Sequence, residues 1–260
     1  MVNIERIGNF CYFIDDNDIQ YNMMKKSIET LIITNKISQL YILFYKRNKN
    51  IIIEDIKKIS MKHKININFD VIEVNDQLSR IIKLPKNALN QNYLKYNSLS
   101  RFFIPYYIPI DSIYYVDNDI LFNTSIYDDI INHDHNKLMI AYEITNYGKR
   151  SGMNAGFLYI NCKKWKESSD IMFNILSYYN DYHESIKWMN QDCYKWLIQN
   201  KYKNECQLIY DERMIINQYM YDPGIKTYHI LGNKNNKTII NEFNKLYNII
   251  INQYKDIKLK

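Results

Sequence analysis

Two short acidic segments contain the residues of this sequence that are best suited to bind a metal ion. Segment 15–18 (Asp-Asp-Asn-Asp) follows an apolar run, and Asp117-Asn118-Asp119 follows another at 113–116. Two carboxylates one residue apart offer hard oxygen ligands for Mg²⁺ or Mn²⁺, ions that keep open positions for phosphate oxygens. A surface turn is the alternative, but apolar residues 120–122 bury the other flank, so we predict a cation site at Asp117 and Asp119.

A third ligand is expected, because a metal site with two carboxylates often includes a neutral imidazole. Of the five histidines, His229 fits best, since it follows an apolar strand-like run and precedes Gly232. His133 and His135 form an H-x-H pair that could bind metal. We interpret this pair as a polar loop, because no apolar residues hold it rigid.

Two further segments have residue types that suit a sugar ligand. Asn154-Ala155-Gly156 precedes the apolar run 157–160. Small residues let a ligand approach the backbone, and an Asn amide can bind sugar hydroxyls; a simple turn into a strand is the alternative. Asn190-Gln191-Asp192 opens a predicted helix, where a plain N-cap is the alternative interpretation.

The glycines exclude two common ways of holding a phosphate. The chain has only six, and their positions are 8, 148, 152, 156, 224 and 232. No placement of these gives G-x-G-x-x-G or G-x-x-x-x-G-K-[ST], so a dinucleotide fingerprint and a P-loop are both excluded. A bound nucleotide would therefore need another group, such as a cation, on its phosphates.

The elements that must position these residues alternate in the first half of the chain. Apolar runs predict strands at 10–14, 40–45, 69–74 and 112–116, separated by predicted helices at 19–33, 51–61 and 92–103. This order predicts a mostly parallel α/β sheet, whose ligands bind beyond the carboxyl ends of the strands. In the second half we predict strands at 137–142, 155–160 and 225–230, and helices at 163–179, 191–199 and 239–254.

Composition excludes several classes of protein. The 260 residues include 47% apolar and 24% charged residues, which is typical of a globular protein rather than a disordered one. The net charge is +6, but the basic residues alternate with acidic ones along the chain, so we expect no nucleic-acid partner.

Membrane spans and disulfides are not expected either. No run of 18 apolar residues suggests a transmembrane segment, and the four cysteines form no C-x-x-C motif. We expect a cytoplasmic protein without a signal peptide. The basic residues 254–260 leave peripheral contact with a membrane open, with a frayed tail as the alternative.

Five separated blocks, taken in order, resemble glycosyltransferase family 8, which includes glycogenin and bacterial lipooligosaccharide galactosyltransferases. The blocks are residues 14–17, 100–102, 114–121, 154–165 and 229–232. The most specific is 154–165, in which Asn-Ala-Gly is followed by Asn-Cys-Lys-Lys-Trp. The blocks span nearly the whole chain.

The resemblance implies a GT-A fold: a Rossmann-like, mostly parallel central sheet flanked by helices, with a smaller mixed sheet in the second half. It also implies a UDP-sugar donor and Mn²⁺, with Mg²⁺ as the alternative. We expect one domain over 1–260, with a nucleotide-binding half at about 1–120, an acceptor and sugar half at about 121–238, and a C-terminal helix at about 239–260.

The resemblance also implies a role for individual residues. It makes Asp117, Asp119 and His229 the metal ligands. The catalytic residues it implies are Gln191, Asp192 and Arg101. The donor-binding residues it implies are Asp15, Asn17, Arg101, Asn118, Asn154, Ala155, Gly156, Gly232 and Lys234.

Two departures from the family pattern affect these roles. Asn190 stands where the family usually has Asp, which removes a charged acceptor near the donor sugar. Asn235 occupies the position of a phosphate-binding lysine, with Lys234 and Lys237 beside it, and the Pro-Trp that usually follows is absent. A local slip of the chain would let Lys234 take that role.

The function implied is retaining, metal-dependent transfer of a hexose, glucose or galactose, from a UDP-sugar to a hydroxyl of a glycan, a lipid-linked sugar or a protein. Attack from the leaving-group face is favoured, with double displacement through Gln191 or Asp192 as the alternative. The alternative hypotheses are a glycogenin-like self-glycosylating protein and a degenerate relative that binds a UDP-sugar without transfer activity. The sequence leaves a homodimer open.

Overall fold

Four parallel strands and two long helices form most of the described first half of the computed structural model. The model describes residues 6–74, 101–146, 149–168, 170–182, 189–231 and 236–258. The elements of this half are β1 (Ile7–Ile14), α1 (Asp18–Thr34), β2 (Ile37–Phe44), α2 (Lys49–His63), β3 (Phe69–Glu73) and β4 (Ser112–Val116). Strand β1 pairs in parallel with β2 and β4, and β2 pairs in parallel with β3. The predicted alternation is confirmed.

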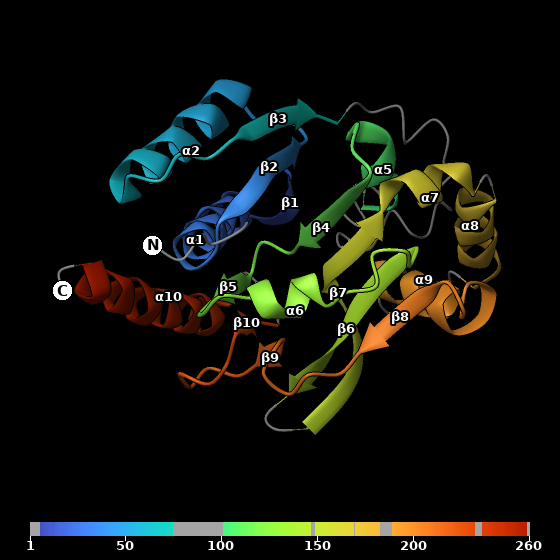
Figure 1. Cartoon of the computed structure of the whole chain (residues 1–260). Helices are drawn as coiled ribbons and strands as arrows, with labels where there is room; N and C mark the ends of the chain where they lie inside the picture. Colours follow the sequence, from blue (N-terminus) through green and yellow to red (C-terminus); the bar gives the residue numbers. More distant parts are fainter. Residues whose placement is uncertain are drawn as a thin grey trace.

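The second half contributes six more strands. They are β5 (Ile120–Phe122), β6 (Met139–Asn146), β7 (Lys149–Asn161), β8 (Cys206–Ile209), β9 (Ile216–Asn217) and β10 (Thr227–His229). One ten-stranded sheet results, in the order β3-β2-β1-β4-β7-β6-β9-β10-β5, with β8 paired to β6 (Figure 1). The mostly parallel sheet is confirmed. The mixed strands do not form a second, smaller sheet, because β7 pairs antiparallel with both β4 and β6 and so continues the first one.

The other α-helices of the described residues are mostly short. They are α5 (Ile104–Tyr107), α6 (Tyr127–Ile131), α7 (Cys162–Glu167), α8 (Ile171–Tyr182), α9 (Met189–Trp196) and α10 (Lys237–Lys258). The helix predicted at 163–179 is wrong as one element: Ser168 leaves the helical conformation (ψ 83°) between α7 and α8. Of the helix predicted at 92–103, residues 92–100 lie outside the described residues, and Arg101–Phe103 form a single 3₁₀ turn.

Helices cover both faces of the sheet, because its strands are apolar on both faces. In β1, Phe10, Tyr12 and Ile14 pack in the core under α1 and α2. The alternating residues Cys11 and Phe13 pack in a second core with α7 and α9. A third core lies under the apolar face of α10. Figure 1 shows this helix beside α1, at the end of the sheet formed by β5.

The candidate site follows from this topology. Strands β1 and β4 are parallel neighbours, so the two acidic segments that follow them lie at the same edge of the sheet. In the described residues no helix is long and apolar enough to cross a membrane. The division into a nucleotide-binding half and an acceptor half stays a prediction.

Candidate metal centre

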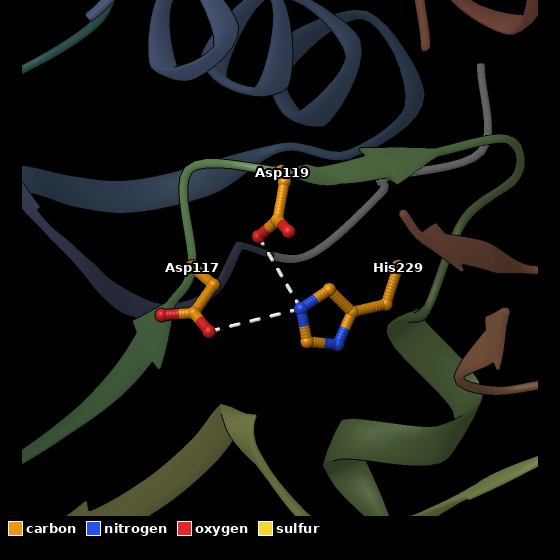
Figure 2. A group of neighbouring side chains, drawn as sticks. All are labelled: Asp117, Asp119 and His229. Carbon is orange, nitrogen blue, oxygen red and sulfur yellow. Dashed lines mark ion pairs between the residues drawn. The ribbon is translucent and has the colours of Figure 1, made fainter. Parts of the chain in front are cut away.

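Asp117, Asp119 and His229 point toward one another at the end of β4 (Figure 2). The two aspartates lie in the turn between β4 and β5. His229 ends β10 and comes next to them because β10 pairs antiparallel with β5, which sets His229 opposite Ile120. Its Nε2 lies 3.2 Å from an Asp119 oxygen and 3.7 Å from an Asp117 oxygen.

The donor set of this cluster fits a divalent cation. One ligand atom from each of the three residues lies within 4.8 Å of the others. Asp119 is 6% exposed and His229 2% exposed, so the ligand atoms are largely removed from water. Two carboxylates and an imidazole suit Mn²⁺ and Mg²⁺, and the imidazole favours Mn²⁺ of the two.

Asp117 is held in place by two donors on its other oxygen. A terminal nitrogen of Arg101 lies 2.8 Å from Asp117 Oδ1, and the Tyr115 hydroxyl donates to the same oxygen at 2.6 Å. The Arg101 guanidinium lies 4.9 Å from the centre of the Tyr115 ring. These contacts leave Oδ2 directed at His229.

Arg101 keeps its charge although it is buried. Burial is the largest single effect and lowers the pKa of the guanidinium, but the neighbouring acidic groups, Asp117 first among them, together raise it by more, so the net pKa lies above the ordinary value. Burial raises the pKa of the Tyr115 phenol well above its usual range, so the phenol remains a proton donor. The cluster therefore contains a fixed cation beside its two carboxylates.

Gly156 of β7 forms the floor of the cluster. A Cβ at this position would lie 2.5 Å from His229 Cε1, 2.8 Å from Asn154 Oδ1 and 3.0 Å from Asp117 Oδ2. The Gly156 carbonyl accepts from the Asp117 amide at 2.7 Å, and its amide donates to Asn154 Oδ1 at 2.7 Å. Only glycine leaves this space open. Asn154 and Gly156 adjoin the cluster, and their donor-binding role stays a prediction.

The acidic segment after β1 is connected to the same turn. The side chain of Asn118 donates to the carbonyl of Phe13 at 3.0 Å, which joins the ends of β1 and β4. Asp15 Oδ1 accepts from the Asn17 amide at 2.9 Å, and Asn17 caps α1 by accepting from the Gln20 amide. Asp15 and Asn17 thus have structural contacts, and their predicted contacts to a nucleotide stay predictions.

Gln191 and Asp192 are half-buried in α9, and their catalytic roles stay predictions. Helix α9 reaches the Arg101 segment through Tyr194, whose ring centre lies 4.6 Å from that of Phe102. Ala155 is buried in β7. Gly232, Lys234 and Asn235 lie outside the described residues, as does the side chain of Asn190.

The interpretation of residues 133–135 as a plain polar loop is wrong for His133. This residue is buried, with Nδ1 3.1 Å from the Tyr114 hydroxyl and Nε2 2.5 Å from the Tyr142 hydroxyl. Burial lowers its pKa to about 4, with His135 adding to the effect. Tyrosines from β4 and β6 hold the ring, which makes His133 a core residue and leaves His135 exposed.

Two residues near the site were not predicted from the sequence to have a role there. Tyr115 orients Asp117, and its place two residues before an aspartate at the end of a buried strand was the available signal. Arg47 donates to the Asp15 carbonyl at 3.0 Å and to Asp18 at 2.9 Å, and lies 4.2 Å from the centre of the Tyr21 ring. Nothing local in the sequence distinguishes Arg47 from other surface cations.

Comparison with solved structures assigns the fold to the GT-A glycosyltransferases. The galactosyltransferase LgtC, crystallised with donor and acceptor sugar analogues, aligns with a TM-score of 0.64 and 16% identity over 92% of this chain and 95% of LgtC. Mouse xyloside xylosyltransferase 1 aligns with a TM-score of 0.57 and 13% identity over 87% of this chain and 98% of that one.

The glycosyltransferase GlyE of Streptococcus pneumoniae is similar in both sequence and structure. It is 27% identical over 112 residues, which are 43% of this chain and 27% of GlyE. Its crystal structure aligns with a TM-score of 0.64 and 17% identity over 98% of this chain and 64% of GlyE. The chain therefore spans less than two thirds of GlyE.

The comparisons confirm the likeness that the five sequence blocks indicated. No family model matches the sequence. The similarity to GlyE in sequence, and to LgtC and GlyE in fold, supports the resemblance to family 8 and the GT-A fold.

Proposed function

We propose that this protein is a divalent-metal-dependent glycosyltransferase that uses a UDP-sugar as donor. One observation carries the proposal: two carboxylates and an imidazole converge at the carboxyl edge of the sheet in a GT-A fold. This edge is where open α/β sheets bind their ligands. The absence of glycine-rich phosphate loops agrees with a cation on the diphosphate.

Asp117, Asp119 and His229 would hold the cation, for which we propose Mn²⁺ with Mg²⁺ as the alternative. When bound, such an ion neutralises charge that develops on the departing diphosphate. Arg101 adds a second, permanent positive charge at the same place and fixes Asp117. Tyr115 keeps Asp117 in one rotamer, so that the ligand set is formed before the nucleotide arrives.

For the reaction itself we propose transfer of glucose or galactose with retention of configuration. The acceptor hydroxyl attacks the anomeric carbon from the face that the UDP leaves, and its proton passes to the departing phosphate oxygen. Gln191 and Asp192 are proposed to lie beside that carbon. The acceptor is a hydroxyl on a glycan, a lipid-linked sugar or a protein, which includes this chain itself.

The experiment is a UDP-release assay with Mn²⁺ over a panel of UDP-sugars, with and without sugar acceptors. We expect release from the wild type and its loss in Asp119→Asn, which keeps the shape of the side chain and removes its charge. Asp128→Asn is the matched control, because Asp128 is exposed in the first turn of α6. Turnover of Asp119→Asn at the wild-type rate would contradict the metal assignment.

Two further readouts separate the remaining functions. A mass increase of the intact protein with UDP-glucose and Mn²⁺ would identify self-glycosylation. Metal-dependent UDP binding by calorimetry, with no release from any donor, would identify a binding protein without transfer. Neither metal-dependent binding nor release would contradict the proposed function as a whole.

A further inference from the structure

A groove separate from the metal centre lies among α1, α2 and α10. Its volume is about 510 Å³, and its apolar floor includes Ile19, Met23, Ile59 and Ile240. In Figure 1, α1 lies between α2 and α10. No residue of the metal cluster lines it.

Four lysines surround this groove, together with two carboxylates. The lysines are Lys25, Lys26, Lys58 and Lys62, and the carboxylates are Glu29 and Asp55. The lining therefore has a net charge of +2, four positive charges less two negative ones. A phosphate monoester carries up to two negative charges, so its binding would bring the groove to neutrality.

The two carboxylates position the lysines but neutralise only two of the four positive charges. Asp55 accepts from Lys25 at 3.1 Å and lies 3.6 Å from Lys58. Glu29 is 5% exposed; it lies 2.6 Å from Lys62 and accepts from the Tyr247 hydroxyl at 2.7 Å. Asp55 thus fixes one lysine on each of two helices, and Glu29 fixes Lys62 of α2 and the Tyr247 hydroxyl of α10.

Lys26 is the cation best placed for a ligand, because its closest contacts are neutral. Its ammonium donates to the side-chain oxygen of Asn244 and lies 5.1 Å from the centre of the Tyr247 ring. Burial lowers its pKa below the ordinary value; Glu29 opposes this effect and Lys25 adds to it. A bound anion would stabilise the charged form of this amine.

We propose that this groove binds a phosphate-bearing ligand, with Lys25, Lys26 and Lys58 on the phosphate and the apolar floor under the rest of the molecule. Hydrogen bonds between ammonium and phosphate are of the strong, charge-assisted kind. The volume exceeds that of a bare phosphate, which favours an organic phosphate ester. The proposal does not rest on the proposed glycosyl transfer.

The test is isothermal titration calorimetry of the full chain with inorganic phosphate and with pyrophosphate, in the absence of divalent metal and nucleotide. We expect binding that weakens as NaCl is raised. The double variant Lys26→Gln/Lys58→Gln should lower affinity at least tenfold, since each lost charge-assisted bond is worth about tenfold. Lys62 is left in place because it neutralises the buried Glu29.

The matched control is Lys57→Gln/Lys245→Gln, which removes the same charge from exposed positions on α2 and α10 outside the groove. It should change affinity less than twofold. A second arm measures binding to vesicles with and without phosphatidic acid. Binding to the vesicles that contain phosphatidic acid, without binding of free phosphate or pyrophosphate, assigns the phosphate to a lipid headgroup. No binding in either arm, or equal binding by the wild type and the Lys26/Lys58 variant, would overturn the proposal.

Discussion

Replacing Gly156 by Ala would place a methyl group inside the candidate metal centre. The new Cβ would lie 2.5 Å from His229 Cε1, whereas two carbon atoms pack best at about 3.5–4.0 Å. The two atoms would overlap by about 1 Å. The same Cβ would also lie 3.0 Å from the Asp117 oxygen that faces the imidazole.

The side chains must move in this variant, because the backbone of β7 is held against β4 at this point. Its neighbour Phe157 pairs with Val116 of β4, and the Gly156 carbonyl accepts from the Asp117 amide. Moving the imidazole by about 1 Å exceeds the roughly 0.2 Å tolerance of metal–ligand distances. We expect metal affinity to fall about 10- to 100-fold, and stability to fall by about 1–3 kcal/mol.

The assay is calorimetric titration of Mn²⁺ in the presence of UDP, with thermal unfolding followed by circular dichroism. Gly224→Ala is the control, since a Cβ there is at least 3.3 Å from its nearest neighbour, in an exposed turn. It should bind Mn²⁺ as the wild type does. A folded Gly156→Ala variant with wild-type Mn²⁺ affinity would refute the packing argument and the placement of His229 in the site.

Two further predictions concern stability. Because the pKa of His133 is about 4 in the folded chain and near 6.5 when unfolded, acid favours the unfolded state, and about 2 kcal/mol should be lost between pH 6.5 and 4. Urea unfolding across this range should show a shallower pH slope in His133→Phe than in the control His135→Phe; equal slopes would contradict the assignment. Asn35→Ala should cost about 1–3 kcal/mol, because Asn35 Oδ1 accepts from the buried Ile126 amide at 2.9 Å. In the same assay, a loss no larger than that of the exposed variant Asn132→Ala would refute it.

The regular elements of the first half were predictable because their signals are local. The run 10–14 is apolar throughout, and it forms the C-terminal part of β1, buried on both faces. Asn17 and Asn48 mark the starts of α1 and α2 as N-caps. The strands β5 and β9 have three and two residues, too few for a period to show, and they exist because neighbouring strands pair with them.

The site was predictable to the extent that its residues are close in sequence or stand at strand ends. Asp117 and Asp119 follow from spacing, and His229 from its place after an apolar run. The contacts that orient them are not local: Arg101 reaches Asp117 from another element, and Gly156 enters from β7. His133 was misjudged for the same reason, since the two tyrosines that bury it come from separate strands.

The charges at the candidate metal centre bear on the proposal that a cation and Arg101 together bind a diphosphate there. Asp117 and Asp119 bring two negative charges and Arg101 one positive charge, so these groups together carry a net charge of −1. Because the groups are largely buried, water screens this charge poorly, and a diphosphate would be repelled. A divalent cation reverses the net charge to +1, and Arg101 keeps its positive charge whether or not the ion is present. On the proposed function, the same reversal would make nucleotide binding depend on the metal, which a glycine-rich loop acting through backbone amides would not require.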